Sequence, residues 1–132
     1  MHTRADRNLR GVVAKRLETQ QLTIMEWLAL GAVSEGSKTG LSMSEIASKL
    51  SVTLPQVTAL VTGLSDRKLT KQKVLASDHR SRQVSATLKG KRLLSKLETA
   101  VSKDVRLLTK DIPEDYLRSY KLVIQQLSEQ KD

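Results

Sequence analysis

The sequence predicts a mainly α-helical protein that carries one small β-hairpin. Three observations support this fold class: a helix-start signature that occurs three times, apolar residues that recur at helical spacing near both ends, and one basic segment, 69–87, in which lysines alternate with leucine and valine. The 132 residues are enough for one domain with a real core. We find no repeat, low-complexity tract or linker that would divide the chain.

The first two helices are predicted over 6–17 and from Thr23 onward. Thr23 is the expected N-cap and Glu26, three residues later, completes a capping box. Leu22 and Trp27 stand at the positions of a hydrophobic staple, and the helix is expected to stop at a glycine, residue 36. We therefore interpret Trp27 as a core residue. The alternative is that it lines a ligand pocket.

The same signature recurs twice, at Ser42 with Glu45 and at Thr53 with Gln56. The helix that starts at Ser42 should end near Leu50, immediately before the next start at Thr53. Two helices joined by so short a turn form a helix-turn-helix.

The rest of the chain is predicted to form the hairpin and two longer helices. The strands are expected over 69–76 and 82–87, with a polar turn at 77–81 between them. A helix over 89–109 and a last helix that opens at Asp111, with Pro113 and Glu114 in its first turn, complete the fold. A basic hairpin directly after a helix-turn-helix is a wing, so the sequence predicts a winged helix-turn-helix flanked by terminal helices.

Composition excludes several classes of function. The chain has no cysteine, and its two histidines, His2 and His79, lie far apart, so we expect no metal site and no cofactor. No Ser or Thr has an adjacent base and no carboxylates form a pair, so an enzyme is not expected. No apolar run approaches the roughly 18 residues of a membrane span, and no signal peptide is recognisable, so we expect a cytoplasmic protein.

The charge distribution points to nucleic acid. The net charge is +9, and the window 65–96 holds ten basic residues against two acidic ones, which places +8 of it in a quarter of the chain. A scattered excess of charge would indicate only a solvated surface, but this one is concentrated. Aromatic residues do not interleave with the basic segment, so duplex DNA fits better than single strands.

The second helix of the pair is the predicted recognition helix. Its outward residues are short, uncharged and hydrogen-bonding, and Gln56 is expected to pair with an adenine edge in the major groove. A polar solvated face is the alternative for these residues taken alone. The residues predicted to contact DNA from this helix are Thr53, Pro55, Gln56, Thr58, Ala59 and Thr62.

Two further groups of residues are candidates for DNA contact. Ser42 and Ser44 at the start of the preceding helix are expected to contact phosphate. In the wing, Arg80 is expected to enter the minor groove, with Asp78 holding its guanidinium by a charge-assisted bond. The complete wing set is Lys71, Lys73, Asp78, Arg80 and Arg82.

The stretch 22–93 resembles a known family of regulators. The matching residues are Leu22, Thr23, Leu41, Ser42, Glu45, Ile46, Ala47, Val57, Thr58, Leu60, Val61, Leu64 and Leu69. The most specific match is Asp78-x-Arg80 in the wing, followed by Thr87 and Gly90. These residues are similar to those of the MarR (multiple antibiotic resistance regulator) family of winged-helix transcriptional regulators. The order of the flanking helices extends the resemblance over nearly the whole chain.

The resemblance implies a triangular dimer whose terminal helices interlock, with each recognition helix in a major groove of a pseudo-palindromic site and Arg80 in the minor groove. Members of the family often bind a small aromatic or lipophilic effector, so an effector of unknown identity is a possible partner. The chain departs from the family at Lys68, where glycine is usual before the residue that enters the wing, and at Thr70 and Gln72. A positive φ at Lys68 would carry strain.

The apolar stripes of the terminal helices exceed what one small core requires, so we expect them to be buried in a homodimer. The predicted dimerisation region is 1–22 with 89–132, and the predicted DNA-binding region is 23–88. The residues expected to line the dimer interface are Leu9, Val12, Val13, Leu17, Leu117, Tyr120, Ile124 and Leu127.

The sequence thus predicts a sequence-specific duplex-DNA-binding transcriptional regulator, a repressor that acts as a homodimer. A sequence-nonspecific or architectural DNA-binding protein is the alternative. It would lose affinity with salt equally on every sequence, whereas a specific regulator prefers one site by on the order of a thousandfold. A third class, a protein-interaction adaptor, would not bind duplex DNA at all.

Overall fold

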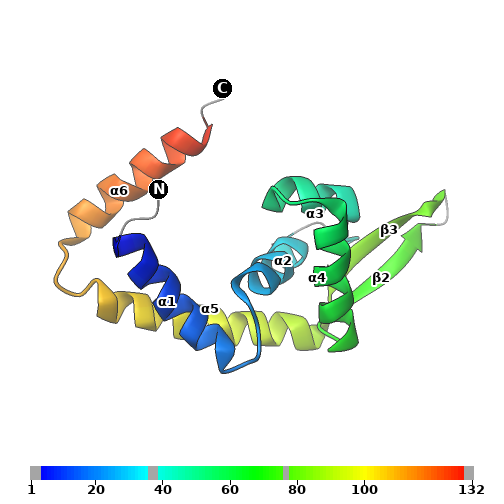
Figure 1. Cartoon of the computed structure of the whole chain (residues 1–132), viewed down its shortest axis with the longest axis horizontal. Helices are drawn as coiled ribbons and strands as arrows, with labels where there is room; N and C mark the ends of the chain where they lie inside the picture. The colour runs from blue at the N-terminus through cyan, green and yellow to red at the C-terminus, as the bar shows by residue number, and fades with distance from the viewer. Residues whose placement is uncertain (1–3, 36–38, 76–77, 130–132) are drawn as a thin grey trace.

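The computed structural model describes residues 4–35, 39–75 and 78–129. Within these ranges the side chains of residues 5, 6, 75, 78–81, 120, 124, 128 and 129 are not described. The elements are α1 (Arg4–Glu18), α2 (Ile24–Glu35), β1 (Leu41–Ser42), α3 (Met43–Leu50), α4 (Leu54–Asp66), β2 (Thr70–Leu75), β3 (Asp78–Ala86), α5 (Leu88–Leu108) and α6 (Glu114–Glu129). This order confirms the predicted fold class of helices with one small wing (Figure 1).

All three predicted capping boxes are present. The carboxylate of Glu26 accepts from the Thr23 backbone N–H at 3.0 Å, and the Thr23 hydroxyl accepts from the Glu26 N–H at 3.1 Å. The reciprocal bonds recur at the start of α3 and at the start of α4. Each box satisfies backbone N–H groups that a helix leaves unpaired at its start, which explains why these three starts are readable in the sequence.

The sheet is larger than predicted. It has three antiparallel strands in the order β1-β3-β2, and β1 pairs Leu41 with Val84 and Ser42 with Gln83. The expectation of a turn over 77–81 was wrong for 78–81, because β3 already begins at Asp78, opposite Leu75, while residue 77 lies outside the described residues. Polar side chains do not prevent this pairing, since the ladder is formed by backbone groups.

The core lies where α2, α3, α4, the base of the wing and the first half of α5 meet. Ile46, Val57, Leu69 and Val84 are among its fully buried side chains. Trp27 is half-buried and packs against this core, as expected for the staple partner of Leu22.

The prediction for Leu17 needs correction. Its side chain has 0 % exposure within the single chain and belongs to the core. It follows that Leu17 stabilises one chain and is not available as a surface for a second copy. The cause is the turn after α1, where the Leu22 N–H donates to the Leu17 carbonyl and folds the chain back over it.

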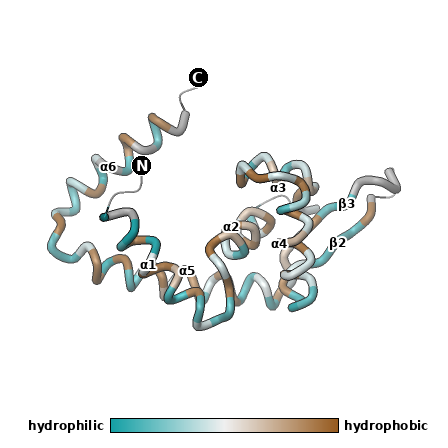
Figure 2. The backbone as a smooth tube through the Cα atoms, in the orientation of Figure 1, coloured by the Kyte–Doolittle hydropathy of each residue, from teal (hydrophilic) through white to brown (hydrophobic). Residues whose placement is uncertain are grey.

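The last helix stands apart from the rest. Figure 1 shows α6 and the wing at opposite ends of the molecule, with α1 lying along α5 between them. The helix begins at Glu114, later than the Asp111 expected from sequence, with Pro113 just before its first turn. Apolar residues recur along α6 (Figure 2), and the exposed large ones are Tyr116, Leu117, Leu122, Val123 and Leu127.

The described residues contain neither a membrane-spanning helix nor a cluster of metal ligands. None of the helices there is long and apolar enough to cross a membrane. In the same parts of the chain, no three His, Asp or Glu side chains gather in a way that would hold a metal ion.

Candidate nucleic-acid interface

Helix α4 buries one face and exposes the other, as the sequence predicts. Val57, Val61 and Leu64 are buried against the core. The opposite face is exposed and carries no charge before Asp66 at the end of the helix. It includes Leu54 and the predicted residues Thr53, Pro55, Gln56, Thr58, Ala59 and Thr62. The structure therefore offers this face to a partner, while its contact with DNA stays a prediction.

The side chain of Gln56 is already engaged within the helix. Its Oε1 accepts from the backbone N–H of Thr53 at 2.9 Å and lies 3.1 Å from the Thr53 hydroxyl, which donates to it. The assignment of the amide oxygen to this position is firm because a backbone N–H can only donate. The sequence pattern indicates both a capping role and a base-reading role for Gln56, and in the structure these two roles compete for the same oxygen.

Thr58 is similarly constrained. Its hydroxyl donates to the carbonyl of Leu54, one turn earlier, at 3.0 Å. The hydroxyl hydrogen is thus used within the helix, and the side chain presents lone pairs and a methyl group to its surroundings.

The start of α3 is occupied by an internal carboxylate. The Ser42 hydroxyl accepts from the Glu45 N–H at 3.1 Å, and Glu45 accepts from the Ser42 N–H at 3.0 Å. Hydrogen bonding to the carboxylate from Ser42, first from its backbone N–H and then from its side chain, lowers the pKa of Glu45. A phosphate at Ser42 would be repelled by this carboxylate. Ser44, by contrast, is exposed and is not part of the capping box.

The register of the hairpin divides the wing cations between two faces. Lys71 pairs with Ser85 and Lys73 with Gln83, so both lysines lie on the sheet face opposite Val84. Arg82 pairs with Val74 and lies on the other face. All three cations are exposed, whereas the side chains of Asp78 and Arg80 lie outside the described residues.

The base of the wing is a junction of three segments. The guanidinium of Arg67 donates to the carbonyls of Gln20 and Gln21 at 2.7 and 2.8 Å, and so ties the end of α4 to the turn between α1 and α2. Lys89 at the start of α5 donates to the carbonyl of Arg67 at 3.0 Å. Both cations belong to the basic window 65–96 that pointed to nucleic acid. The structure shows that both also hold the wing in place.

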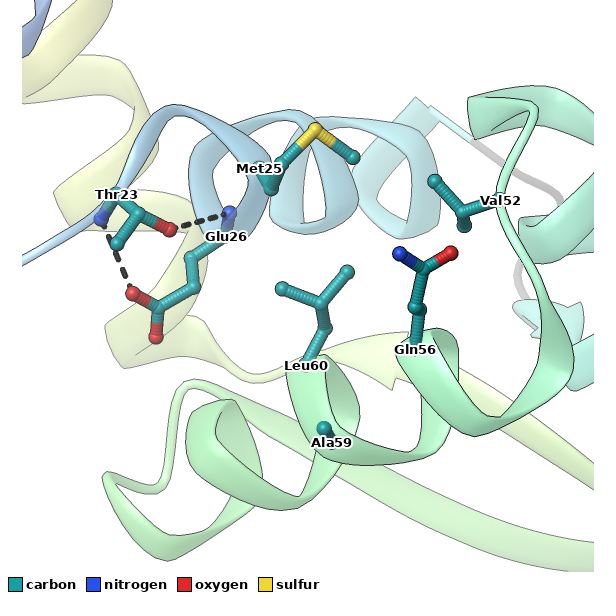
Figure 3. A pocket seen from close by; sticks show the side chains of 7 residues that line it. All are labelled: Thr23, Met25, Glu26, Val52, Gln56, Ala59 and Leu60. Carbon is teal, nitrogen blue, oxygen red and sulfur yellow. Dashed lines mark hydrogen bonds between the residues drawn. The ribbon is translucent and has the colours of Figure 1, made fainter.

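A shallow groove runs between the start of α2 and the exposed face of α4 (Figure 3). Its volume is about 470 Å³, and it is lined by Thr23, Met25, Glu26, Val52, Gln56, Ala59 and Leu60. Gln56 and Ala59 therefore belong both to the candidate DNA-binding face and to this groove.

Comparison with solved structures identifies the fold. The chain is similar to a transcriptional regulator (MarR family) from Rhodococcus sp. RHA1, with 21% identity, a TM-score of 0.80 and coverage of 92% of this chain and 85% of the other. It is similar to MepR of S. aureus in a DNA complex, with 22% identity, a TM-score of 0.79 and coverage of 93% and 90%. It is also similar to CouR of Rhodococcus jostii RHA1 bound to p-coumaroyl-CoA, with 22% identity, a TM-score of 0.82 and coverage of 98% and 90%.

The chain is thus a winged helix-turn-helix protein with helical extensions. Its particular fold is that of the MarR-family regulators, which confirms the resemblance seen in the sequence. Neither a scan of protein-family models nor a search of curated protein sequences found a match.

Proposed function

We propose that this chain is a sequence-specific duplex-DNA-binding transcriptional regulator that acts as a homodimer and represses from a pseudo-palindromic operator. Helix α4 enters the major groove, Arg80 of the wing enters the minor groove, and Lys71, Lys73 and Arg82 contact phosphates. The observation that carries this proposal is the exposed, uncharged face of α4 beside a cationic hairpin on one winged-helix frame. MepR, which shares the fold, is known in complex with DNA.

The homodimer is supported by apolar surface that the single chain leaves uncovered. Leu9 on α1 is 41 % exposed, and α6 exposes further large apolar residues. A second copy is the simplest partner for it, since a two-fold dimer also matches a palindromic site. We retain the proposed division into 1–22 with 89–132 for dimerisation and 23–88 for DNA binding. The proposed interface comprises Leu9, Val12, Val13, Leu117, Tyr120, Ile124 and Leu127, of which the side chains of Tyr120 and Ile124 lie outside the described residues.

Selection of bound duplexes from a random pool tests the proposal. A specific regulator enriches one pseudo-palindromic sequence and binds it on the order of a thousandfold more tightly than random duplex. Uniform binding that weakens equally with salt on every sequence identifies an architectural DNA-binding protein instead. No retained duplex identifies a protein-interaction adaptor.

Replacement of the wing arginine tests the minor-groove contact. We expect Arg80→Ala to weaken operator binding on the order of tenfold or more, because an arginine in the narrow minor groove meets enhanced negative potential. Lys110→Ala removes the same charge from the α5–α6 connection, away from the wing, and serves as control. Equal loss for the two variants contradicts the assigned role of Arg80.

A second observation favours regulation by a small molecule. The indole Nε1 of Trp27 is buried, and it makes no hydrogen bond within the described part of the chain, which is costly for such a donor. Trp27 lines a groove of about 310 Å³ together with Leu28, Lys49, Leu94 and Glu98. We propose that an effector binds there and changes operator affinity.

Fluorescence of the single tryptophan tests this second proposal. Titration with a panel of aromatic carboxylic acids should give a saturable change for at least one compound, with weaker operator binding at the same concentrations. Trp27→Phe keeps the ring and removes the N–H, so it should weaken that compound's effect on operator binding. An unchanged effect in Trp27→Phe excludes this groove as the effector site.

A further inference from the structure

We propose that α4 reads a thymine, through Nε2 of Gln56 and the methyl group of Ala59. This inference rests on the proposed function and makes it more specific, and it replaces the adenine expected for Gln56 from sequence. It follows from which atoms of the exposed face are already in use and from what lies beside them.

The amide of Gln56 has only its donor side free. Adenine recognition in the major groove needs both halves of the amide, the oxygen accepting from N6 and the nitrogen donating to N7. In this chain Oε1 is held by the N–H and the hydroxyl of Thr53, at 2.9 and 3.1 Å. Adenine pairing would leave the first turn of α4 without its cap. A base edge that presents acceptors leaves the cap intact.

Three bases present an acceptor in the major groove, namely adenine at N7, guanine and thymine, and only thymine carries an apolar group there. Guanine offers O6 and N7, whereas thymine offers O4 next to a C5-methyl group. Figure 3 shows the nitrogen of Gln56 on the side of the groove where Leu60 and Met25 lie, with Ala59 farther along the same helix. The lining of this groove is mainly apolar, and it belongs to the same exposed surface as Gln56.

The apolar residues near Gln56 therefore decide among these three bases. Ala59 stands about one helical turn after Gln56 and is exposed, and both residues line the same groove. A thymine whose O4 accepts from Gln56 can place its C5-methyl against Ala59 and Leu60, while guanine, or adenine bound through N7 alone, would leave this apolar surface uncovered. Contact of small apolar side chains with the thymine methyl is a recurrent mode of base recognition.

The test uses the full chain and the duplex selected from a random pool. Each thymine of the selected site is replaced singly by deoxyuridine, which removes the C5-methyl and keeps O4. We expect one position in each half-site to lose about threefold to fivefold in affinity, the effect of removing one buried methyl group. Replacing that thymine by any other standard base should cost on the order of tenfold or more.

A matched pair of variants assigns the effect to Gln56. Gln56→Glu keeps an acceptor for Thr53, so the thermal unfolding temperature should not fall, but it removes the donor. The preference for thymine over other bases at that position should then fall by about tenfold or more, beyond any uniform loss from the added charge. Glu45→Gln makes the reverse exchange in the capping box of α3 and should leave the base preference unchanged.

The possible results separate the two levels of the proposal. Enrichment of adenine at the position sensitive to Gln56→Glu, or equal affinity for thymine and deoxyuridine at every position, overturns the thymine assignment and leaves the regulator proposal intact. Failure to enrich any duplex overturns the proposed function and this inference with it.

Discussion

Lys68 adopts a left-handed backbone conformation, with φ of +62°, at the point where the chain leaves α4 for the wing. The Lys68 N–H donates to the Ser65 carbonyl and the Leu69 N–H to the Leu64 carbonyl, both at 2.9 Å, which is the Schellman pattern that usually has glycine at this position. Leu69, fully buried, fixes the exit direction of the chain. The strain expected for lysine here is therefore present in the structure, held by the surrounding contacts.

Replacing this lysine by glycine should stabilise the protein. We expect Lys68→Gly to raise the free energy of unfolding by about 0.5–1 kcal/mol, because glycine has no Cβ to penalise a positive φ, although it loses more entropy on folding. Chemical denaturation measures the change. Lys68→Ala is the control, since it removes the same side chain and keeps the strain. A gain of the same size in both variants would show that the lysine side chain, and not the backbone conformation, causes the effect.

Two helical glycines differ sharply in the space around them. A Cβ on Gly90 would clash with the carbonyl oxygen of Leu69, whereas a Cβ on Gly63 would lie 3.7 Å from its nearest neighbour, Oε2 of Glu26. Gly90→Ala should thus cost about 3 kcal/mol or more by forcing α5 from the base of the wing. Gly63→Ala should gain up to about 1 kcal/mol from helix propensity. Thermal or chemical unfolding tests both, and similar stability of the two variants would contradict this close packing.

At the scale of elements, one ion pair fixes α1 to α5. The guanidinium of Arg16 donates to both oxygens of Asp104, at 2.7 and 2.9 Å. The hydrogen bonds from Arg16, which outweigh the cost of partial burial, lower the pKa of Asp104. A carboxyl whose folded-state pKa lies below its unfolded value contributes stability above the unfolded pKa and loses it as pH falls through the folded pKa.

We therefore expect Asp104→Asn to be less stable than the parent at neutral pH and to show a smaller loss of stability on acidification. The difference between the two proteins should shrink as the pH falls below about 4, the ordinary pKa of Asp. Unfolding by urea at a series of pH values measures it. Glu98→Gln, at an exposed carboxyl on the same helix, is the control for the change of charge, and an equal response of the two variants would refute the role of the ion pair. Part of the acid sensitivity should remain in both, since the pKa of Glu45 is also lowered.

The elements that sequence predicted well are those specified by local chemistry. Thr23, Ser42 and Thr53 each lie three residues before a Glu or Gln that completes a capping box, so the starts of their helices can be predicted from four consecutive residues. Strand β1 is only Leu41–Ser42, too short for any periodicity, and it exists because β3 continues far enough to pair with it. The chain can enter β1 in this way because residue 40 is glycine, since a Cβ on Gly40 would clash with the carbonyl of Val84.

The candidate site shows the same limit at finer scale. Which face of α4 is exposed follows from the spacing of Val57, Val61 and Leu64, and the structure confirms it. Which atoms on that face remain free does not follow from spacing, because it depends on the rotamer of Gln56. The hydrogen bonds from Arg67 to the carbonyls of Gln20 and Gln21 join residues far apart in sequence, and no local sequence pattern predicts them.

At the scale of the whole molecule, the apolar surface of α6 sets the final prediction. Leu127 is 58 % exposed in the single chain, and helical spacing puts it on the same stripe as Leu117. Gln125 is exposed as well and lies on the opposite side of the helix. If the stripe is covered by a second copy, a charge on it must be buried without a partner, whereas a charge at Gln125 stays in water.

We expect Leu127→Glu to shift the protein from dimer to monomer in sedimentation equilibrium at micromolar concentration, and Gln125→Glu, which introduces the same carboxylate, to leave it dimeric. Loss of the dimer should also weaken operator binding by Leu127→Glu. In a dimer, binding of one winged domain to its half-site holds the second domain at a high effective concentration near the other half-site, and a monomer loses this advantage. A Leu127→Glu protein that still sediments as a dimer would remove α6 from the interface. If it also keeps full operator affinity, the two recognition helices must be joined through another surface of the chain.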